Sequence, residues 1–134
     1  MISYRTGNQL ALDAVIELYR SSGLGVYRPV DDPARMQQML ENANLVVTAW
    51  DDARLVGISR SLSDFSFATY LADLAVHAEY QRQGIGRELM RRTQAAGGQA
   101  KIFLFAAPEA EPYYPHVGFS KGSGWYLNEF RRVR

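Results

Sequence analysis

The residues whose types and spacing most clearly suggest a chemical function form a glycine turn. This turn follows an apolar segment and precedes an amphipathic segment. The turn reads Gln-Arg-Gln-Gly-Ile-Gly-Arg over residues 81–87. The first backbone N–H groups of a helix have no acceptors within that helix, and the helix dipole adds partial positive charge there. Because Gly84 and Gly86 carry no Cβ, an anion can approach this backbone closely. The turn therefore predicts a phosphate or pyrophosphate site with polar and cationic side chains at its rim.

The glycine spacing alone does not identify a ligand. No Lys-Ser/Thr pair follows the glycines, as a P-loop requires. A third glycine and a downstream ribose-binding acid, which a dinucleotide-binding fold requires, are also missing. On the turn alone, a tight strand-to-helix connection without a ligand is an equal alternative. The elements around the turn are needed to choose between the two.

Hydrophobic periodicity predicts strands and helices on both sides of the turn. Apolar residues recur at helical spacing from Leu10 to Tyr19, and this helix should end near Gly23. Asp32 before Pro33 predicts the start of a second helix. The other expected elements are strands at 2–5, 45–50, 54–60, 67–76, 101–106 and 124–130, a turn at 61–66, a helix from 85 to the glycines at 97–98, and a short helix at 108–116.

The glycine turn and this order of elements together resemble the Gcn5-related N-acetyltransferase (GNAT) superfamily. The signature of that family is Gln/Arg-x-x-Gly-x-Gly/Ala after a strand, which here falls on Gln81, Gly84 and Gly86. The resemblance extends over essentially the whole chain. It implies an α+β (mixed α/β) fold, in which a central mixed, mostly antiparallel sheet is flanked by helices in a single domain over residues 1–134.

The resemblance also implies that acetyl-CoA is the cosubstrate. In this family, backbone groups of the fourth strand pair with the pantetheine arm, and amides of the following turn hold the pyrophosphate. The positions that match on this sequence are Leu74 and Val76 on the strand and Gln81, Arg82, Gln83, Gly84, Ile85, Gly86 and Arg87 on the turn.

A second segment, Pro-Tyr-Tyr-Pro-His-Val-Gly-Phe at 112–119, resembles the family's Phe-Tyr-x-x-x-Gly-Phe stretch. The tyrosine of that stretch lies beside the CoA sulfur, and Tyr114 falls on it. The implied role is general acid, because a phenol can protonate a departing thiolate without ionising at neutral pH. The alternative is that Tyr113 and Tyr114 are core or groove-lining aromatics. Pro115 and His116 depart from the acidic and basic residues that are frequent there in the family.

Transfer to an amine also requires a base, because an alkylammonium is almost fully protonated at neutral pH. Asp73 is the first candidate, since a carboxylate within an apolar strand needs a reason to be there. Its alternative is a structural carboxylate that is paired with an arginine such as Arg60 or caps a neighbouring loop. His77 and Glu79, at the mouth of the turn, are weaker candidates because both can be ordinary solvated loop residues.

The resemblance places acceptor specificity in the connection between the first two helices and in the last hairpin. The connection, residues 23–32, includes Tyr27, Arg28 and two acids, a mixture that suits an amine-bearing substrate. Asp32 can equally be a helix cap and Asp31 a surface residue. The stretch at 60–64 resembles an Arg-x-x-x-Asp pattern of small bacterial and plastid-type members, and it fixes no substrate.

Composition excludes several other classes. The 15 basic and 14 acidic side chains nearly cancel, so a nucleic-acid partner is not expected. The arginines that could serve one, Arg87, Arg91, Arg92, Arg131, Arg132 and Arg134, are more simply a solvated helix face and a frayed terminus. Because the chain has no cysteine, no disulfide, thiolate metal site or cysteine nucleophile is expected, and we assign no metal. No signal-like segment or long apolar run is present, so we expect a cytoplasmic protein without a membrane partner.

We therefore expect an N-acetyltransferase, an acyltransferase that uses acetyl-CoA and in which a primary amine attacks the thioester directly. The acceptor is a small-molecule amine or a protein amine. The alternative is a non-catalytic acyl-CoA-binding or regulatory domain of the same fold, which could dispense with Tyr114 and Asp73. The sequence leaves the acceptor and the oligomeric state open, with a homodimer as one option.

Overall fold

The computed structural model describes residues 1–134 and contains five strands and four α-helices, with three short 3-10 helices between them. The strands are β1 (Ile2–Thr6), β2 (Leu45–Asp51), β3 (Arg54–Ser63), β4 (Ala68–Val76) and β5 (Lys101–Phe103). The α-helices are α1 (Leu12–Ser22), α2 (Pro33–Glu41), α3 (Ile85–Ala96) and α4 (Tyr113–His116). The 3-10 helices are η1 (Leu24–Tyr27), η2 (Ala78–Tyr80) and η3 (Pro108–Ala110).

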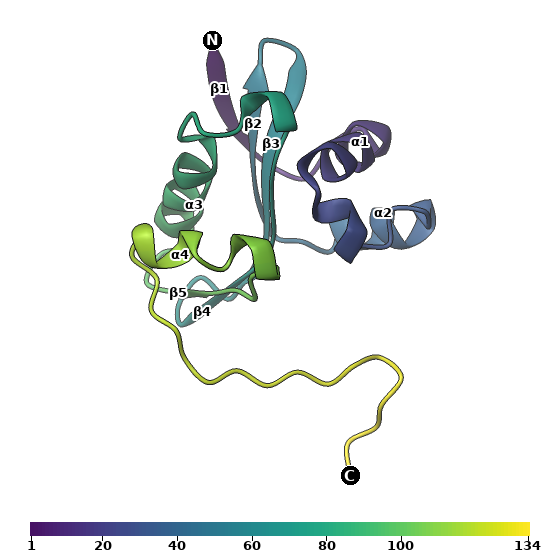
Figure 1. The fold of residues 1–134 in the computed structure, drawn as a ribbon, viewed down its shortest axis with the longest axis vertical. Helices are drawn as coiled ribbons and strands as arrows, with labels where there is room; N and C mark the ends of the chain where they lie inside the picture. The colour runs from purple at the N-terminus through teal and green to yellow at the C-terminus, as the bar shows by residue number, and fades with distance from the viewer.

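The strands form one sheet in the order β1-β2-β3-β4-β5. Strands β1 to β4 are antiparallel to their neighbours, and β5 is parallel to β4. Figure 1 shows α3 on one side of the sheet and α1 and α2 on the other. The expected α+β fold, a mixed and mostly antiparallel sheet between helices, is confirmed.

Each face of the sheet has its own apolar layer. Buried side chains of α1 and α2, among them Leu18 and Met36, pack against one face. Ile85 and Leu89 of α3 pack against the other. Here α3 approaches β3 closely, because a Cβ on Gly57 would lie 3.1 Å from Leu89 Cδ1 and 3.2 Å from Ile85 Cγ2. Gly57 thus lets the start of α3 sit directly on the sheet.

Strand β5 accompanies only the first part of β4. The parallel pairing joins Ala68–Tyr70 to Lys101–Phe103 and then stops, because the chain leaves β5 for η3 and α4. A β-bulge lies nearby, where Arg60 pairs with Asp73 and Ser61 with Leu71, so that Ala72 is the extra residue of β4. The second half of β4 therefore has a neighbour only on its β3 side.

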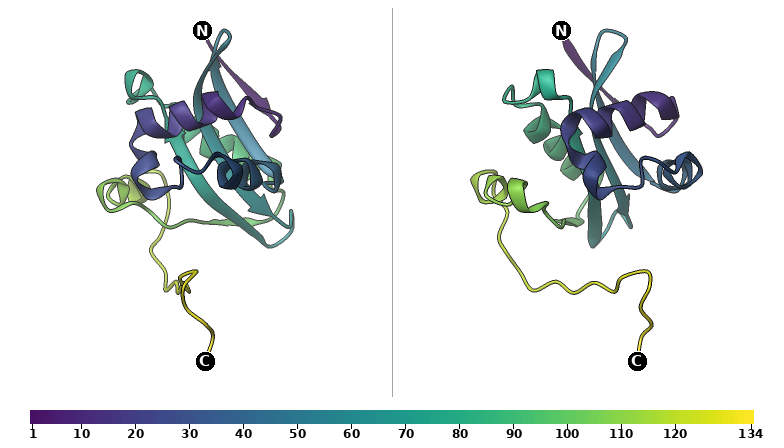
Figure 2. Two further views of the ribbon diagram at one scale, coloured as in Figure 1. Left: turned by 90° about the vertical axis from the view of Figure 1, so that its right-hand side faces the viewer. Right: turned by 45° about the vertical axis from the view of Figure 1, so that its right-hand side comes forward.

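The expected strand at 124–130 is wrong. Residues 120–134 are exposed and contain no helix or strand. Figure 2 shows this segment extending away from the body of the molecule. A strand forms only where its backbone can pair with the edge of another strand. The one backbone hydrogen bond of this segment is local, from Arg131 N–H to Asn128 O, so the segment has no such pairing.

Three smaller boundaries also differ from expectation. Strand β3 continues to Ser63 instead of ending at Arg60, because Ser61, Leu62 and Ser63 pair with Leu71, Tyr70 and Thr69 of β4. The turn begins at Asp64, whose carboxylate accepts from the N–H groups of residues 66–68. Strand β5 ends at Phe103, and residues 108–116 form η3 and α4 in place of one helix.

Candidate active site

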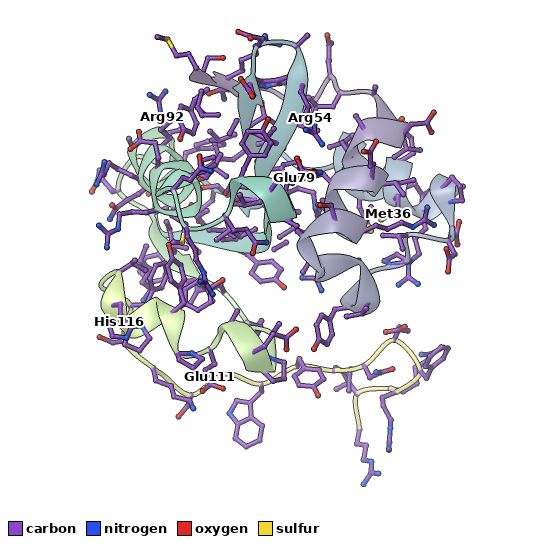
Figure 3. All side chains as sticks on the ribbon, turned by 45° about the horizontal axis from the view of Figure 1, so that its top comes forward. Met36, Arg54, Glu79, Arg92, Glu111 and His116 are labelled. Atoms are coloured by element: carbon purple, nitrogen blue, oxygen red, sulfur yellow. The ribbon has the colours of Figure 1, made fainter.

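A groove of about 1420 Å³ opens where β4 and β5 separate. Its lining comes from the α1–α2 connection and α2, from Arg60 and Leu62 of β3, from β4, from residues 80–87, from the segment Phe105 to Tyr114, and from Tyr126 to Glu129 of the C-terminal segment. In Figure 3, the labelled residues Glu111 and His116 mark the α4 side of the molecule. The groove therefore joins segments that are far apart in the sequence.

The glycine turn forms one end of this groove. Gly84 precedes α3 with φ 83°, a left-handed conformation that favours glycine. The N–H groups of residues 84–87 have no acceptor within the chain. A Cβ on Gly86 would lie 3.7 Å from Tyr113 Oη and 3.8 Å from Val76 Cγ2, so Gly86 keeps the backbone accessible from the groove. This arrangement is suited to an anion at the start of α3.

The unpaired edge of β4 continues from that end. His77 N–H donates to Val56 O at 2.9 Å, which fixes the residues of β4 that face β3. Because backbone groups alternate along an antiparallel pair, those of Leu74 and Val76 face the open side. The Gln81 side chain donates to Val76 O at 2.9 Å, so it closes the turn onto the strand instead of standing free at the rim.

The structure thus brings most of the expected acetyl-CoA residues to one groove. Those that line it are Leu74, Val76, Gln81, Arg82, Gly84, Ile85, Gly86 and Arg87. Gln83 lies in the same turn but does not line the groove. The expected pyrophosphate and pantetheine positions therefore lie on one continuous surface.

Tyr114 lines the groove from α4. Its half-buried ring packs edge-on against Tyr113 at 5.4 Å and against Phe119 at 5.5 Å, measured between ring centres. Burial raises the pKa of Tyr114 above its usual value of 10.0, with a smaller contribution from Tyr113. The phenol is therefore protonated at neutral pH and available as a hydrogen-bond or proton donor.

Asp73 is fully buried and tightly bonded. Its Oδ2 accepts from Tyr19 Oη and from Arg60 Nε, each at 2.6 Å, and its Oδ1 accepts from Arg28 Nε at 2.5 Å. Burial pushes the pKa of Asp73 upward, but Arg60, Arg28 and the Tyr19 hydroxyl together hold it below its ordinary value of 3.8. A carboxylate with a lowered pKa is a weak base at neutral pH. The geometry therefore favours the alternative of a structural carboxylate paired with arginines.

His77 and Glu79 lie outside the groove. His77 is buried, with its Nε2 2.9 Å from Arg54 Nη2, and Glu79 Oε2 is 3.6 Å from Arg54 Nη1. Figure 3 shows the labelled Arg54 and Glu79 close together near η2. Glu79 thus belongs to a surface ion pair and His77 is a packed, buried ring, and both are separate from the groove.

Two groove contacts escape sequence reasoning. Tyr27 Oη donates to Glu109 Oε2 at 2.9 Å and so joins the α1–α2 connection to η3. These residues are 82 positions apart, and no local pattern relates them. The sequence places Tyr19 on the apolar side of a helix, whereas in the structure its hydroxyl donates a hydrogen bond to Asp73. Only the fold reveals either contact.

The structure contains no group of three or more His, Cys, Asp or Glu side chains arranged to hold a metal ion. None of its helices has the length and apolar character needed to cross a membrane.

Comparisons with known proteins agree with this geometry. An uncharacterized N-acetyltransferase, ycf52-like, from Prochlorococcus marinus is 32% identical over 70% of this chain. That match covers 59% of the relative's length, so the chain spans less than two thirds of it.

An acetyltransferase of the GNAT family from Streptococcus pneumoniae TIGR4 has the same fold, with a TM-score of 0.77, 24% identity, and coverage of 96% of this chain and 99% of that one. Aminoglycoside N-acetyltransferase AAC(6')-Iy, solved in complex with CoA, superposes with a TM-score of 0.74 at 15% identity over 99% of this chain and 96% of that one. Residues 19–125 match the family model described as "Acetyltransferase (GNAT) domain", and the chain therefore belongs to the GNAT acetyltransferase family.

Proposed function

We propose that this protein is a cytoplasmic N-acetyltransferase that moves the acetyl group of acetyl-CoA directly onto a primary amine. The observation that carries the proposal is the continuity of the unpaired β4 edge with the unpaired N–H groups of residues 84–87 along one groove. The acceptor is a small-molecule amine or a protein amine, and nucleic acid and membrane have no part in the reaction.

The two ends of this surface match the two parts of CoA. The pyrophosphate would accept hydrogen bonds from the free amides at the start of α3, where the helix dipole is favourable. Arg82 and Arg87 line the same end of the groove and can add positive charge. The pantetheine arm would pair with the backbone of Leu74 and Val76, as an added strand does.

Different residues of the chain would then polarise the thioester, protonate the leaving sulfur and position the arginines. A β4 N–H polarises the thioester carbonyl, as an oxyanion donor does. The neutral amine attacks that carbonyl, a C–N bond forms, and the C–S bond breaks when the tetrahedral intermediate collapses. Tyr114 donates its hydroxyl hydrogen to the departing sulfur. Asp73 fixes Arg28 and Arg60 beside the strand. Water in the groove accepts the amine proton and returns a proton to the Tyr114 phenolate.

The test combines binding and turnover. Calorimetry should show saturable acetyl-CoA binding, and an amine panel should release free CoA thiol in step with an acetylated product detected by mass spectrometry. Binding without transfer to any amine would support the non-catalytic acyl-CoA-binding alternative. Absence of acetyl-CoA binding would refute both.

A further inference from the structure

The floor of the groove contains more positive than negative charge. Arg28 and Arg60 both bind the carboxylate of Asp73, and the third ligand, the Tyr19 hydroxyl, is neutral. The side chains of Asp73, Arg60 and Arg28 are 0%, 10% and 24% exposed. Two guanidinium groups and one carboxylate leave one net positive charge in a largely desolvated place, where solvent screens it weakly.

Both arginines keep unused N–H groups. Arg28 donates from Nε to Asp73, from Nη1 to Tyr27 O at 2.9 Å and from Nη2 to Ala72 O at 2.8 Å, so one hydrogen on each Nη has no partner. Arg60 donates from Nε to Asp73 and from Nη1 to Met39 O at 3.1 Å, and its Nη2 has no partner. Among the fully buried side-chain polar atoms, Ser61 Oγ alone lacks a hydrogen-bond partner. Arg60 Nη2, which also lacks a partner, is therefore not fully buried. Both arginines line the groove.

A third cation lies beside them. Arg35, at the start of α2, lines the groove and an adjoining cavity of about 690 Å³, and its side chain has no hydrogen-bond or ion-pair partner. Of the nearby acids, Asp31 pairs with Arg20 at 2.8 Å, Asp32 caps α2 by accepting from Arg35 N–H at 3.1 Å, and Glu109 accepts from Tyr27 Oη. Asp73 is the one carboxylate that pairs with Arg28 and Arg60, and no carboxylate forms an ion pair with Arg35.

The position of these cations relates them to the acceptor. The bulge at Ala72 turns its carbonyl to Arg28, and Asp73 immediately precedes Leu74 on the open edge of β4. The cations thus lie beside the end of the strand at which the thioester is expected, on the side of the α1–α2 connection. An anion bound there would lie on the acceptor side of the expected thioester.

From these contacts we propose that the acceptor is an amine that also carries a carboxylate, as an amino acid does. The proposal rests on the N-acetyltransferase function proposed above. A carboxylate accepts paired N–H groups from guanidinium with favourable geometry, and it would pair with Arg35 and with the unused N–H groups of Arg28 and Arg60. Polycationic acceptors such as polyamines or aminoglycosides are repelled by the same groups.

Matched acceptor pairs test the proposal: phenylalanine against phenethylamine, and lysine against cadaverine. We expect kcat/KM to be at least about 10-fold higher for the carboxylate-bearing member of a pair, mainly through KM, which corresponds to about 1.4 kcal/mol. Arg35→Gln should remove most of this preference without changing acetyl-CoA affinity. Arg35 is exposed and unpaired, so this variant should fold, and Arg134→Gln in the exposed C-terminal segment is the matched control.

The outcomes separate the two proposals. Acetylation of both members of a pair at equal efficiency, or a preference that Arg35→Gln leaves intact, would overturn the carboxylate proposal alone. Acetyl-CoA binding with no transfer to any acceptor, or no binding at all, would overturn the N-acetyltransferase function and the carboxylate proposal with it.

Discussion

Asp73 influences the groove through the arginines that it holds. It connects α1, the α1–α2 connection and β3 through Tyr19, Arg28 and Arg60. Removing one partner of a buried ion pair leaves an uncompensated charge, which is more costly than losing an exposed pair. At the residue scale, this network therefore both stabilises the fold and positions Arg28 and Arg60 on the acceptor side of the groove.

Asp73→Asn should lower the free energy of unfolding by about 3–5 kcal/mol, measured by urea denaturation at pH 7. The control is Asp31→Asn, which breaks an exposed pair with Arg20 and should cost less than about 1 kcal/mol. Equal effects of the two substitutions would contradict the assignment of Asp73 as the centre of a buried network.

The same carboxylate predicts a pH dependence. The pKa of Asp73 in the fold is below the ordinary value of 3.8, so the carboxylate stabilises the fold fully above that value. Its contribution is lost as pH falls through the lowered pKa. The stability difference between wild type and Asp73→Asn should therefore shrink below about pH 4, and a difference that stays constant into strong acid would argue against an ionised Asp73.

Tyr114→Phe should reduce kcat by about 100-fold and leave the Kd for acetyl-CoA unchanged, because the phenyl ring retains the packing but cannot donate a hydrogen. Tyr4→Phe, on β1 and outside the groove, is the control. Stopped-time thiol release and calorimetry measure the two quantities. Unchanged turnover in Tyr114→Phe would eliminate Tyr114 as the proton donor.

At the scale of elements, the separation of β4 from β5 and the start of α3 produce one surface. The groove opens because β5 follows β4 only as far as Tyr70. Gly57 lets α3 lie close on the sheet, so that its free N–H groups meet the open edge of β4. Neither element would form the surface alone.

Gly84→Val should weaken acetyl-CoA binding at least about 10-fold, because φ 83° is strained for a β-branched residue by about 1–3 kcal/mol and the turn must rearrange. No heavy atom lies within 4 Å of a Cβ at Gly84, so the effect would come from the backbone and not from a clash. Gly122→Val, in the exposed C-terminal segment, is the control. Calorimetric affinities that are equal for both variants would show that the turn does not hold the ligand.

At the scale of the molecule, the sequence predicted what depends on local pattern and missed what depends on distant partners. The period of apolar residues located α1, α2 and α3, and the glycine spacing located the turn before α3. The strand expected at 124–130 failed because pairing requires an edge that no local pattern supplies. Likewise, the bond between Arg28 and Asp73 joins residues 45 positions apart, and the sequence suggested an arginine partner such as Arg60 without identifying Arg28.

The two tryptophans test how the body of the molecule and its C-terminal segment differ. Trp50 packs against the core beside α1 and α2, and its Nε1 donates to Thr48 Oγ1 at 2.8 Å, whereas Trp125 is 93% exposed. Trp50→Ala should lower the free energy of unfolding by at least about 2 kcal/mol, and Trp125→Ala by less than about 0.5 kcal/mol. A large cost for Trp125→Ala in chemical denaturation would mean that the Trp125 side chain packs on the body.

We propose that one groove holds acetyl-CoA between β4 and the start of α3. The most direct measurement is an acetyl-CoA titration followed by the backbone amide NMR signals of the ¹⁵N-labelled protein. The account predicts saturable shifts that concentrate on the amides of Leu74, Val76 and residues 84–87 and that are lost in Gly84→Val. Shifts confined to other surfaces, or no shift at saturating acetyl-CoA, would contradict it.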